Sequence, residues 1–506
     1  MGPGSAELRR TGLLATCVAL AVLWTLSSLA TDVPFPPSAF AQALVRAAPG
    51  EVATFFIELL HHWAVRLLTL GVLAGSLLVG AQALVATASK GAPRPLRAAA
   101  VLVTLSALAS FGASFGAVNV VATVLALLVT GAIYAYTAGA LHGLDHAGPG
   151  APDESRRRAL RLGVGGAVAV AAAGGGLGWL IRRLSGPDTD VAIATPRVRA
   201  RVPERPPFPD VAGLTREVTS VRDHYVVDIN LVRPAVEVDG WTLSVRGEVE
   251  RPLELSFAEL QRDFEFVEEY AVLTCVSNEV GGDLIGHSLW GGVRLAEVLE
   301  KAGVRPGAVD LVLRAADGYS DSIPAELGRD PGVLLTVAQN RRPLTQDHGF
   351  PCRLRVPPIF GMKNVKWLES IEVVGVDHEG YWQQRGWSDD ASVRTQSRID
   401  VVGNGFSAAR GRPTWIAGVA WAGARGVSRV EVSTDGGETW SDAELRAPIG
   451  PLSWRQWAYR WTPEGEGGTT VMCRATDGGG DVQTSATAPP HPSGATGLHS
   501  MTVEVT

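Results

Sequence analysis

The chain has 506 residues, enough for about three domains of ordinary size. Hydrophobic residues make up 46% and charged residues only 19%, a mixture typical of a membrane region joined to a soluble one. The net charge of −6 argues against nucleic acid as a partner. The four cysteines form no C-x-x-C pair, so zinc ribbons, iron–sulfur ligation and covalent haem attachment have no support.

Five apolar stretches before residue 185 are long enough to cross a bilayer. The basic residues between them collect mainly on one face, which the positive-inside rule assigns to the cytoplasm. The N-terminus is then cytoplasmic and the C-terminal half extracytoplasmic, as in a multi-pass protein of the cell membrane. The stretches lie near Thr11–Ala30, Ala53–Val79, Leu96–Ala117, Val120–Leu141 and Leu162–Ile181.

The segment that precedes the fifth stretch, Ser155–Arg161, has the sequence SRRRALR. It resembles a twin-arginine export signal with alanine in place of phenylalanine, and a weakly apolar helix follows it. Its arginines are equally suited to a simple positive-inside anchor. Twin-arginine export, which carries domains across the membrane already folded, is the hypothesis we favour.

Histidines also occur in or beside the apolar stretches, and they raise the possibility of a haem. His61 and His62 fall in the second stretch, and His142 and His146 end the fourth. A haem needs two ligands at one depth on facing helices. His62 is expected about 15 Å from the outer edge at helical rise, whereas His142 lies near the inner surface, so we predict no haem.

The composition changes again after the apolar stretches. Ser185–Pro209 is proline-rich and is expected to be an extended linker that holds a domain off the membrane. Up to Asp400, strand-like runs mix with helical ones such as Ser256–Phe264 and Val293–Gly303, which indicates an α+β domain. Ser256 is placed to cap its helix with Glu259 in a capping box. The expected domains are 1–184, 185–214, 215–399 and 400–506.

Beyond Asp400 the helical pattern ends. Short alternating runs are separated by Gly, Pro and Asp turns, which is typical of a β-sandwich. Asp435-Gly436-Gly437 is a hairpin signal. The tryptophans of this segment are expected to serve as core and edge aromatics rather than as a binding platform; they are Trp415, Trp421, Trp440, Trp454, Trp457 and Trp461.

Two motifs in the α+β segment carry the chemistry. LTCVSNEVGG (Leu273–Gly282) places Cys275 after an apolar strand and before a polar, Gly-containing loop, where a thiolate can reach a soft metal. HGFPCRLRVPPIFGMKNVKWLESIEVV (His348–Val374) sets an arginine and lysines around a loop, which suits a phosphate-bearing ligand. The alternatives are a cysteine packed inertly in the core and solvated charges at strand ends.

Over roughly Thr215–Thr506 the chain resembles the sulfite oxidase superfamily of molybdopterin-dependent oxidoreductases. The resemblance implies a molybdenum ion on a pyranopterin, Cys275 as its protein ligand, and an immunoglobulin-like dimerisation domain after residue 400, hence a possible homodimer. Arg353 and Lys366 then become charge partners of the pterin phosphate. The residues expected to contact the cofactor are Val226, Asp228, Asn230, Cys275, Asp317, His348, Arg353, Asn364, Val365 and Lys366.

The substrate pocket departs from the family pattern. Val280 and Asp228 stand where sulfite oxidases carry arginines, and Trp382-Gln383-Gln384 is not followed by the family's active-site tyrosine. A carboxylate in place of an anion-binding arginine repels sulfite. Asp228 and Trp387 are therefore our candidates for shaping a rebuilt pocket, which suits a neutral or cationic substrate.

The sequence leaves several functions open. We expect two-electron oxygen-atom transfer on a small substrate, with electrons exchanged with a separate cytochrome or quinone-linked carrier. Sulfite oxidation, sulfoxide reduction and a metal-free, membrane-tethered scaffold are the alternatives. Cys352 and Cys473 are expected to be free thiols, since Cys352 falls inside the expected cofactor strand.

Overall fold

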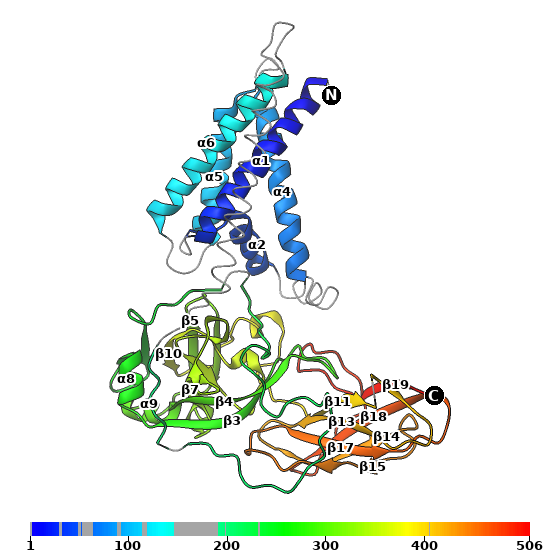
Figure 1. Ribbon diagram of the computed structural model, residues 1–506. Coiled ribbons are helices and arrows are strands. Elements are labelled where there is room, and N and C mark those ends of the chain that lie inside the picture. Colours follow the sequence, from blue (N-terminus) through cyan, green and yellow to red (C-terminus); the bar gives the residue numbers. More distant parts are fainter. Residues whose placement is uncertain are drawn as a thin grey trace. The chain divides into compact units, whose positions relative to one another are not determined.

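The computed structural model divides the chain into two compact units. The helical unit contains Met1–Asp188 and the short segment Ile229–Ala235, and the β-rich unit contains Thr189–Asp228 and Val236–Thr506. The structure describes residues 3–29, 33–48, 52, 64–88, 93–113, 119–145, 191–197, 199–230, 233–403 and 405–506. Figure 1 shows the helical unit in blue and cyan and the β-rich unit in green to red.

The helical unit has a helix at each of the first four apolar stretches, although residues 53–63 of the second and 114–117 of the third lie outside the described residues. Four of its helices are long and apolar enough to cross a membrane: α1 (Pro3–Leu29), α4 (Ala64–Thr87), α5 (Pro95–Ala113) and α6 (Val120–Asp145). The fifth stretch lies outside the described residues, together with the twin-arginine-like segment and with His61, His62 and His146.

A further helix, α2 (Pro36–Ala47), occupies the stretch between the first two spans that the sequence analysis treated as a loop. Proline at its start is compatible with a first helical turn, whose N–H groups have no intrahelical acceptor. Packing among the long helices depends on small residues. A Cβ at Gly12 of α1 would lie 2.9 Å from the Cα of Ala81 in α4, so the two backbones approach closely.

The first part of the β-rich unit is the mixed domain that the sequence predicted. One sheet has the order β2-β1-β10-β5-β6, and the second has the order β3-β4-β7-β8 with β9 paired to β7. The strands are β1 (Thr242–Gly247), β2 (Leu253–Ser256), β3 (Phe266–Thr274), β4 (Ile285–Arg294), β5 (Asp310–Ala315), β6 (Ser320–Pro324), β7 (Leu334–Gln339), β8 (Arg342–Pro343), β9 (Arg353–Arg355) and β10 (Leu368–Val374).

Two helices join these strands where the sequence placed them. Helix α8 (Phe257–Arg262) begins at Ser256, whose side chain and Glu259 form the predicted capping box. Helix α9 (Leu295–Ala302) ends at Gly303, which takes the left-handed conformation that a helix stop favours. Short 3-10 turns, η2 (Leu327–Arg329), η3 (Gln346–His348), η4 (Gly361–Lys363) and η5 (Gln383–Arg385), carry the loops between strands.

The predicted β-sandwich follows. One sheet has the order β11-β13-β17-β16 and the other β12-β19-β18-β14-β15. Trp457 and Trp461 lie in the core between them, whereas Trp421 and Trp454 pack into the mixed domain's core. The strands are β11 (Gln396–Val402), β12 (Ser407–Ala408), β13 (Thr414–Trp421), β14 (Val427–Ser433), β15 (Ser441–Asp442), β16 (Glu444–Leu445), β17 (Arg455–Trp461), β18 (Gly467–Asp477) and β19 (His499–Val505).

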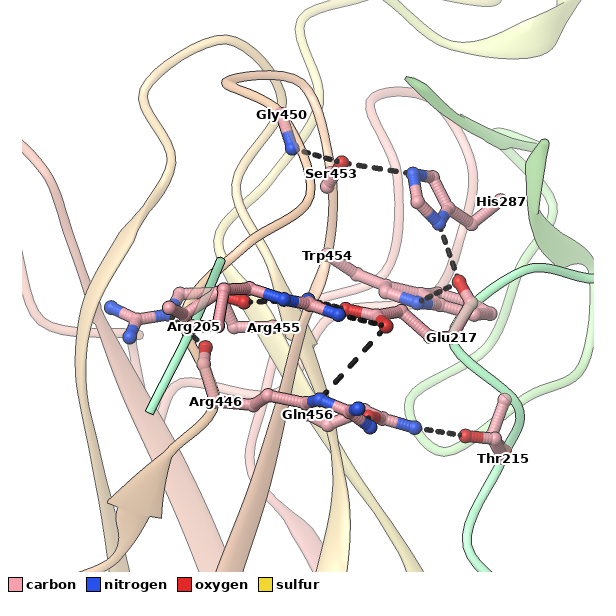
Figure 2. Close-up of polar contacts among 11 residues, drawn as sticks. Arg205, Thr215, Glu217, His287, Arg446, Gly450, Ser453, Trp454, Arg455 and Gln456 are labelled. Atoms are coloured by element: carbon pink, nitrogen blue, oxygen red, sulfur yellow. Dashed lines mark hydrogen bonds and ion pairs between the residues drawn. The ribbon is translucent and has the colours of Figure 1, made fainter. Parts of the chain in front are cut away.

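The described part of the expected linker packs onto the β-rich unit through polar contacts (Figure 2). Arg205 forms an ion pair with Glu217 and donates a hydrogen bond to Ala447 O at 2.9 Å. Glu217 O accepts from Trp454 Nε1 at 3.0 Å and from His287 Nδ1 at 2.5 Å. This stretch therefore lies against both the mixed domain and the sandwich.

His287 completes the junction between the mixed domain and the sandwich. Its Nε2 lies 2.9 Å from Ser453 Oγ, and its side chain is fully buried. Burial lowers the pKa of His287 to about 4. The ring is therefore neutral at physiological pH, with Nδ1 as a donor and Nε2 as an acceptor from Ser453.

Candidate active site

Cys275 lies in a loop that closes on itself between β3 and β4. Its backbone N–H donates to Leu284 O at 2.9 Å, and its carbonyl accepts from Asn278 N at 3.1 Å. The side chain of Asn278 accepts from Leu284 N at 2.9 Å. A Cβ at Gly282 would lie 2.6 Å from Asn278 Oδ1, so only glycine fits that turn. The loop thus holds the cysteine at a fixed place.

The Cys275 side chain is 7% exposed, and its Sγ lies 3.5 Å from Ser277 Oγ. Burial raises the pKa of the thiol, although contacts with Ser277 oppose the shift. A thiolate here therefore depends on a positive partner such as a metal ion. Among the described residues there is no group of three or more His, Cys, Asp or Glu side chains that could hold a metal ion.

A cluster of rings surrounds His348, one of the predicted contacts. His224 lies between three rings, with centroids 5.3 Å from Tyr225, 5.4 Å from His348 and 5.6 Å from Trp290. A Cβ at Gly286 would lie 2.5 Å from the His224 ring, so glycine makes room for it. His348 Nε2 donates to Val221 O at 2.9 Å.

Both histidines are neutral at physiological pH. Burial, together with the neighbouring positive charge of Arg353 and, for His224, with His348, lowers the pKa of His224 to about 3 and that of His348 to about 4. His224 Nε2 is buried, and within the part of the chain that the structure describes it has no hydrogen-bond partner. It is thus a polar atom that a bound group can satisfy.

Arg353 of β9 is the most unusual charge of the site. It is 4% exposed, it donates to His348 O and Asn364 O at 3.2 Å each, and its guanidinium lies 5.4 Å from the Trp290 ring centroid. Burial lowers the pKa of Arg353 to about 10, so the group is still charged. Its Nε has no hydrogen-bond partner among the described residues, and none of their carboxylates forms an ion pair with it, although the charge of Asp228 acts on it from farther away.

Arg355 shows what a compensated arginine looks like on the same strand. It is equally buried, but it forms an ion pair with Glu269. A buried charge without a counter-charge is costly. The lack of an ion-pair partner makes Arg353 the candidate for binding an anionic group, and its buried guanidinium fits the phosphate of a pterin cofactor.

Lys366 was expected to face that phosphate, and Asp228 was expected to shape the substrate pocket. In the structure the two form an ion pair, with side chains 14% and 5% exposed, and Lys366 Nζ also donates to Asp347 O at 3.2 Å. The negative charge of Asp228 is therefore balanced. An ammonium has three N–H donors, so Lys366 can serve a carboxylate and a phosphate oxygen together.

Asn364 and Val365, two further predicted contacts, make hydrogen bonds within the protein. Asn364 uses its side chain within the protein, accepting from Val356 N at 2.7 Å and donating to Phe360 O at 3.1 Å. The neighbouring Val365 is buried, and its carbonyl accepts from Leu354 N at 2.8 Å. The hydrogen bonds of the Asn364 side chain hold the loop that precedes Lys366 in place. Contacts with a ligand would then come from the backbone of this loop.

Asn230 is grouped with the helical unit, where it accepts from Gln42 and Arg46 of α2. Val226 is half-buried and directly follows Tyr225. Asp317 is buried and accepts from Tyr319 N at 2.9 Å. Within the β-rich unit the structure brings Arg353, His348 and Asn364 into contact.

Trp387 is 6% exposed and packs between Trp382 and His491, with centroid distances of 6.0 Å and 5.0 Å. Its Nε1 is buried without a hydrogen-bond partner among the described residues. His491 comes from the sandwich domain, so both domains of the β-rich unit contribute rings here. The polar atom left on Trp387 is consistent with its expected place in a pocket wall.

Tyr225 and His224 are site residues that the sequence reasoning missed. A Cβ at Gly361 would lie 2.7 Å from Tyr225 Oη and 3.3 Å from Thr274 O, so the phenol lies beside the end of β3. Burial raises the pKa of Tyr225, and a charge on Cys275 raises it further. The sequence signal that could have found them is their position, since His224-Tyr225 comes immediately before the predicted contact Val226.

Comparisons with known proteins identify the family of the chain. Residues 230–382 match the oxidoreductase molybdopterin binding domain, and residues 393–488 match the Mo-co oxidoreductase dimerisation domain. Sulfite oxidase of Gallus gallus is 31% identical over 341 residues, which cover 57% of this chain and 74% of that protein. The chain belongs to the sulfite oxidase family of molybdopterin oxidoreductases.

Other relatives define the limits of this assignment. A nitrate reductase of Hordeum vulgare is 31% identical over 306 residues, 49% of this chain and 34% of that protein. The chain spans less than half the length of several curated relatives it matches. The sulfane dehydrogenase SoxCD of Paracoccus pantotrophus shares the fold, with a TM-score of 0.51 and 24% identity over 57% of this chain and 82% of that one.

Replacing Arg353 by glutamine tests the role of the buried cation. Without it the pterin phosphate loses its buried counter-charge, so the molybdenum content of purified protein is expected to fall to about a tenth or less. Metal analysis by mass spectrometry measures this. Arg355→Lys is the matched control, because it keeps a cation beside Glu269 on the same strand and should retain the metal. Equal metal in the wild type and in Arg353→Gln would contradict the assignment.

Proposed function

We propose that the protein is a membrane-anchored, extracytoplasmic molybdopterin-dependent oxidoreductase that moves an oxygen atom to or from a small substrate in a two-electron reaction. The observation that carries this proposal is the buried charge of Arg353, which forms no ion pair among the described residues, in a family that binds an anionic pterin. Molybdenum, when bound, supplies the redox and oxygen-transfer chemistry. The chain supplies ligation, orientation and the local field.

The residues divide this work. Cys275 would hold the metal through Sγ, Arg353 supplies the positive charge for the phosphate, and Lys366, paired with Asp228, can still donate an N–H to a phosphate oxygen. The neutral imidazoles of His348 and His224 provide hydrogen bonds without adding charge. Backbone groups near Val226, Asp317, Asn364 and Val365 complete the expected cofactor contacts.

Tyr225 can supply a phenol in place of the family's active-site tyrosine. The family's tyrosine after the W-Q-Q stretch is absent here, but the phenol of Tyr225 lies beside the strand end that carries Cys275. Because burial raises the pKa of Tyr225, its O–H stays protonated. It can donate a hydrogen bond to an oxygen atom held next to the cysteine.

The pocket favours a neutral substrate over sulfite. Val280 and Asp228 replace the two anion-binding arginines, and the pairing of Asp228 with Lys366 leaves that side of the site close to neutral. Because Lys366 balances the charge of Asp228, this carboxylate is not itself expected to repel sulfite. An anion is disfavoured because the two anion-binding arginines are missing. Trp387 adds an aromatic wall with one N–H donor.

The substrate is tested with the purified full-length protein in detergent. Reduction of methionine sulfoxide by a reduced viologen dye should proceed, whereas sulfite oxidation with ferricyanide as the acceptor should remain near background. The physical reason is that an anion gains no charge partner in the pocket. Robust sulfite oxidation would overturn the pocket argument while leaving the cofactor assignment intact.

Assembly and electron exchange follow from the same family features. The match of residues 393–488 to the dimerisation domain supports a homodimer. Electrons are exchanged with a separate carrier, a cytochrome or a quinone-linked membrane partner. Neither assignment enters the chemistry of the site, which is built within one chain.

The location rests on the four apolar helices and on the pattern of basic residues around them. If Ser155–Arg161 is a twin-arginine signal, replacing Arg156 and Arg157 by lysine keeps the charge but strands the β-rich unit in the cytoplasm. Protease added outside the cell should then cleave that unit in the wild type and spare it in the double variant. Cleavage in both would favour a simple positive-inside anchor.

A further inference from the structure

Two residues of the sandwich contact the loop that carries Cys275. Arg398 of β11 donates a hydrogen bond from Nη1 to Gly282 O at 2.8 Å. The ring of His499, at the start of β19, lies against the preceding residue, because a Cβ at Gly281 would clash with its Nε2. Both contacts therefore fall on the pair of glycines that precedes the end of the loop.

The glycine pair is the part of the loop with the greatest conformational freedom. Gly281 has a φ of +78°, in the region that favours glycine. Because glycine loses more conformational entropy on folding than any other residue, two in succession need contacts that restrain them. The Asn278 side chain lies against Gly282, and the backbone N–H of Asn278 donates to Cys275 O at 3.1 Å. A displacement of the glycine pair is therefore transmitted to the cysteine.

Arg398 is fixed in the orientation that its contact with the loop requires. Its side chain is 12% exposed, its Nε pairs with Asp400 at 2.6 Å, and its Nη2 donates to Thr215 Oγ1 at 3.0 Å. The N–H groups of a guanidinium form a rigid planar fork, so partners that hold Nε and Nη2 also direct Nη1 towards Gly282 O. Because Asp400 already balances its charge, Arg398 is suited to hold the loop rather than to bind an anion.

The ring of His499 is also held in one orientation. Its Nδ1 accepts from Ile399 N at 2.9 Å, which requires that Nδ1 carries no proton. Burial and the charge of Arg398 lower the pKa of His499, although Asp400 opposes the shift, so the ring is neutral at physiological pH. His499 thus packs against Gly281 as an uncharged ring, and the hydrogen bond to the loop comes from Arg398.

We propose that Arg398 is a positioning residue of the metal site: from the sandwich it holds the glycine pair of the loop and so keeps the Cys275 thiol in place for the metal. A ligand that is already held in place binds a metal without a further loss of loop entropy. This inference rests on the proposed role of Cys275 as the metal ligand. It gives the sandwich a task within one chain, in addition to the dimerisation that its family match supports.

Alkylation of the thiols in the full-length protein tests the proposal without metal. The protein is made in a host that lacks the pterin cofactor and treated with iodoacetamide, and each cysteine is followed by peptide mass spectrometry. In Arg398→Met, Cys275 is expected to react about tenfold faster than in the wild type, because the loop without its charge-assisted hydrogen bond opens more often. Cys352 and Cys473, buried free thiols of the mixed domain and the sandwich, should react at unchanged rates.

Two control variants separate this contact from the general stability of the sandwich. Asp400→Asn removes the ion pair but keeps the hydrogen bond from Arg398 to the loop. Arg474→Met removes an arginine of β18 that pairs with Glu431 within the sandwich. Cys275 should react at close to the wild-type rate in both. The double variant Asp400→Asn with Arg398→Met, which leaves no unpaired buried carboxylate, should show the same increase as Arg398→Met even if that single variant folds poorly.

The loaded protein provides the second readout. The thiolate-to-metal absorption should shift in the double variant, because the sulfur is held less firmly, and should stay unchanged in Arg474→Met. Equal alkylation of Cys275 in the wild type and in the double variant would refute the proposal. A parallel rise at all three cysteines of the double variant, or an unchanged absorption in it, would also refute the proposal. Lack of molybdenum in the wild type would instead refute the proposed function and leave the alkylation result standing.

Discussion

The burial of the Arg353 charge, which forms no ion pair among the described residues, is the constraint on which the proposed site depends. Arg353 is buried against Trp290 and held by two backbone carbonyls, while Arg355 on the same strand is neutralised by Glu269. A fold does not retain such a charge for its own stability, because desolvation costs more than two neutral hydrogen bonds return. An anionic ligand removes that cost, and in this family the ligand is a pterin with a phosphate.

The fold keeps this site rigid through contacts far apart in sequence. The loop after β3 closes on Asn278 and Leu284, and the junction with the sandwich is held by His287, Glu217 and Trp454. His224 Nε2, whose ring lies beside His348, has no hydrogen-bond partner among the described residues, so a bound group can satisfy it.

Much of the fold was predictable from local patterns. Hydropathy found the four described spans, Ser256 and Glu259 marked a capping box, and alternating runs with turn residues indicated the sandwich. These features depend on short-range periodicity, which one sequence displays directly. Cys275, His348 and Arg353 were found through motif resemblance, and their assigned roles remain proposals.

The parts that were not predictable depend on partners distant in the chain. Lys366 forms an ion pair with Asp228, 138 residues away in the chain, and each side chain then cancels the charge of the other. Tyr225 and His224 gain their importance only when the loop with Gly361 and the strand with Gly286 pack against them. The sequence analysis placed no helix at α2, and the contacts of Asn230 with Gln42 and Arg46 of that helix likewise join residues far apart in the chain.

The most direct test is a molybdenum assay with a visible absorption spectrum, on protein from a molybdenum-replete host, comparing the wild type with Cys275→Ala and with Cys473→Ala. The wild type and Cys473→Ala, which alters only the sandwich core, should contain molybdenum and show the thiolate-to-metal absorption. Cys275→Ala should lack that absorption. A wild type without molybdenum, or a Cys275→Ala spectrum identical to it, would contradict the account.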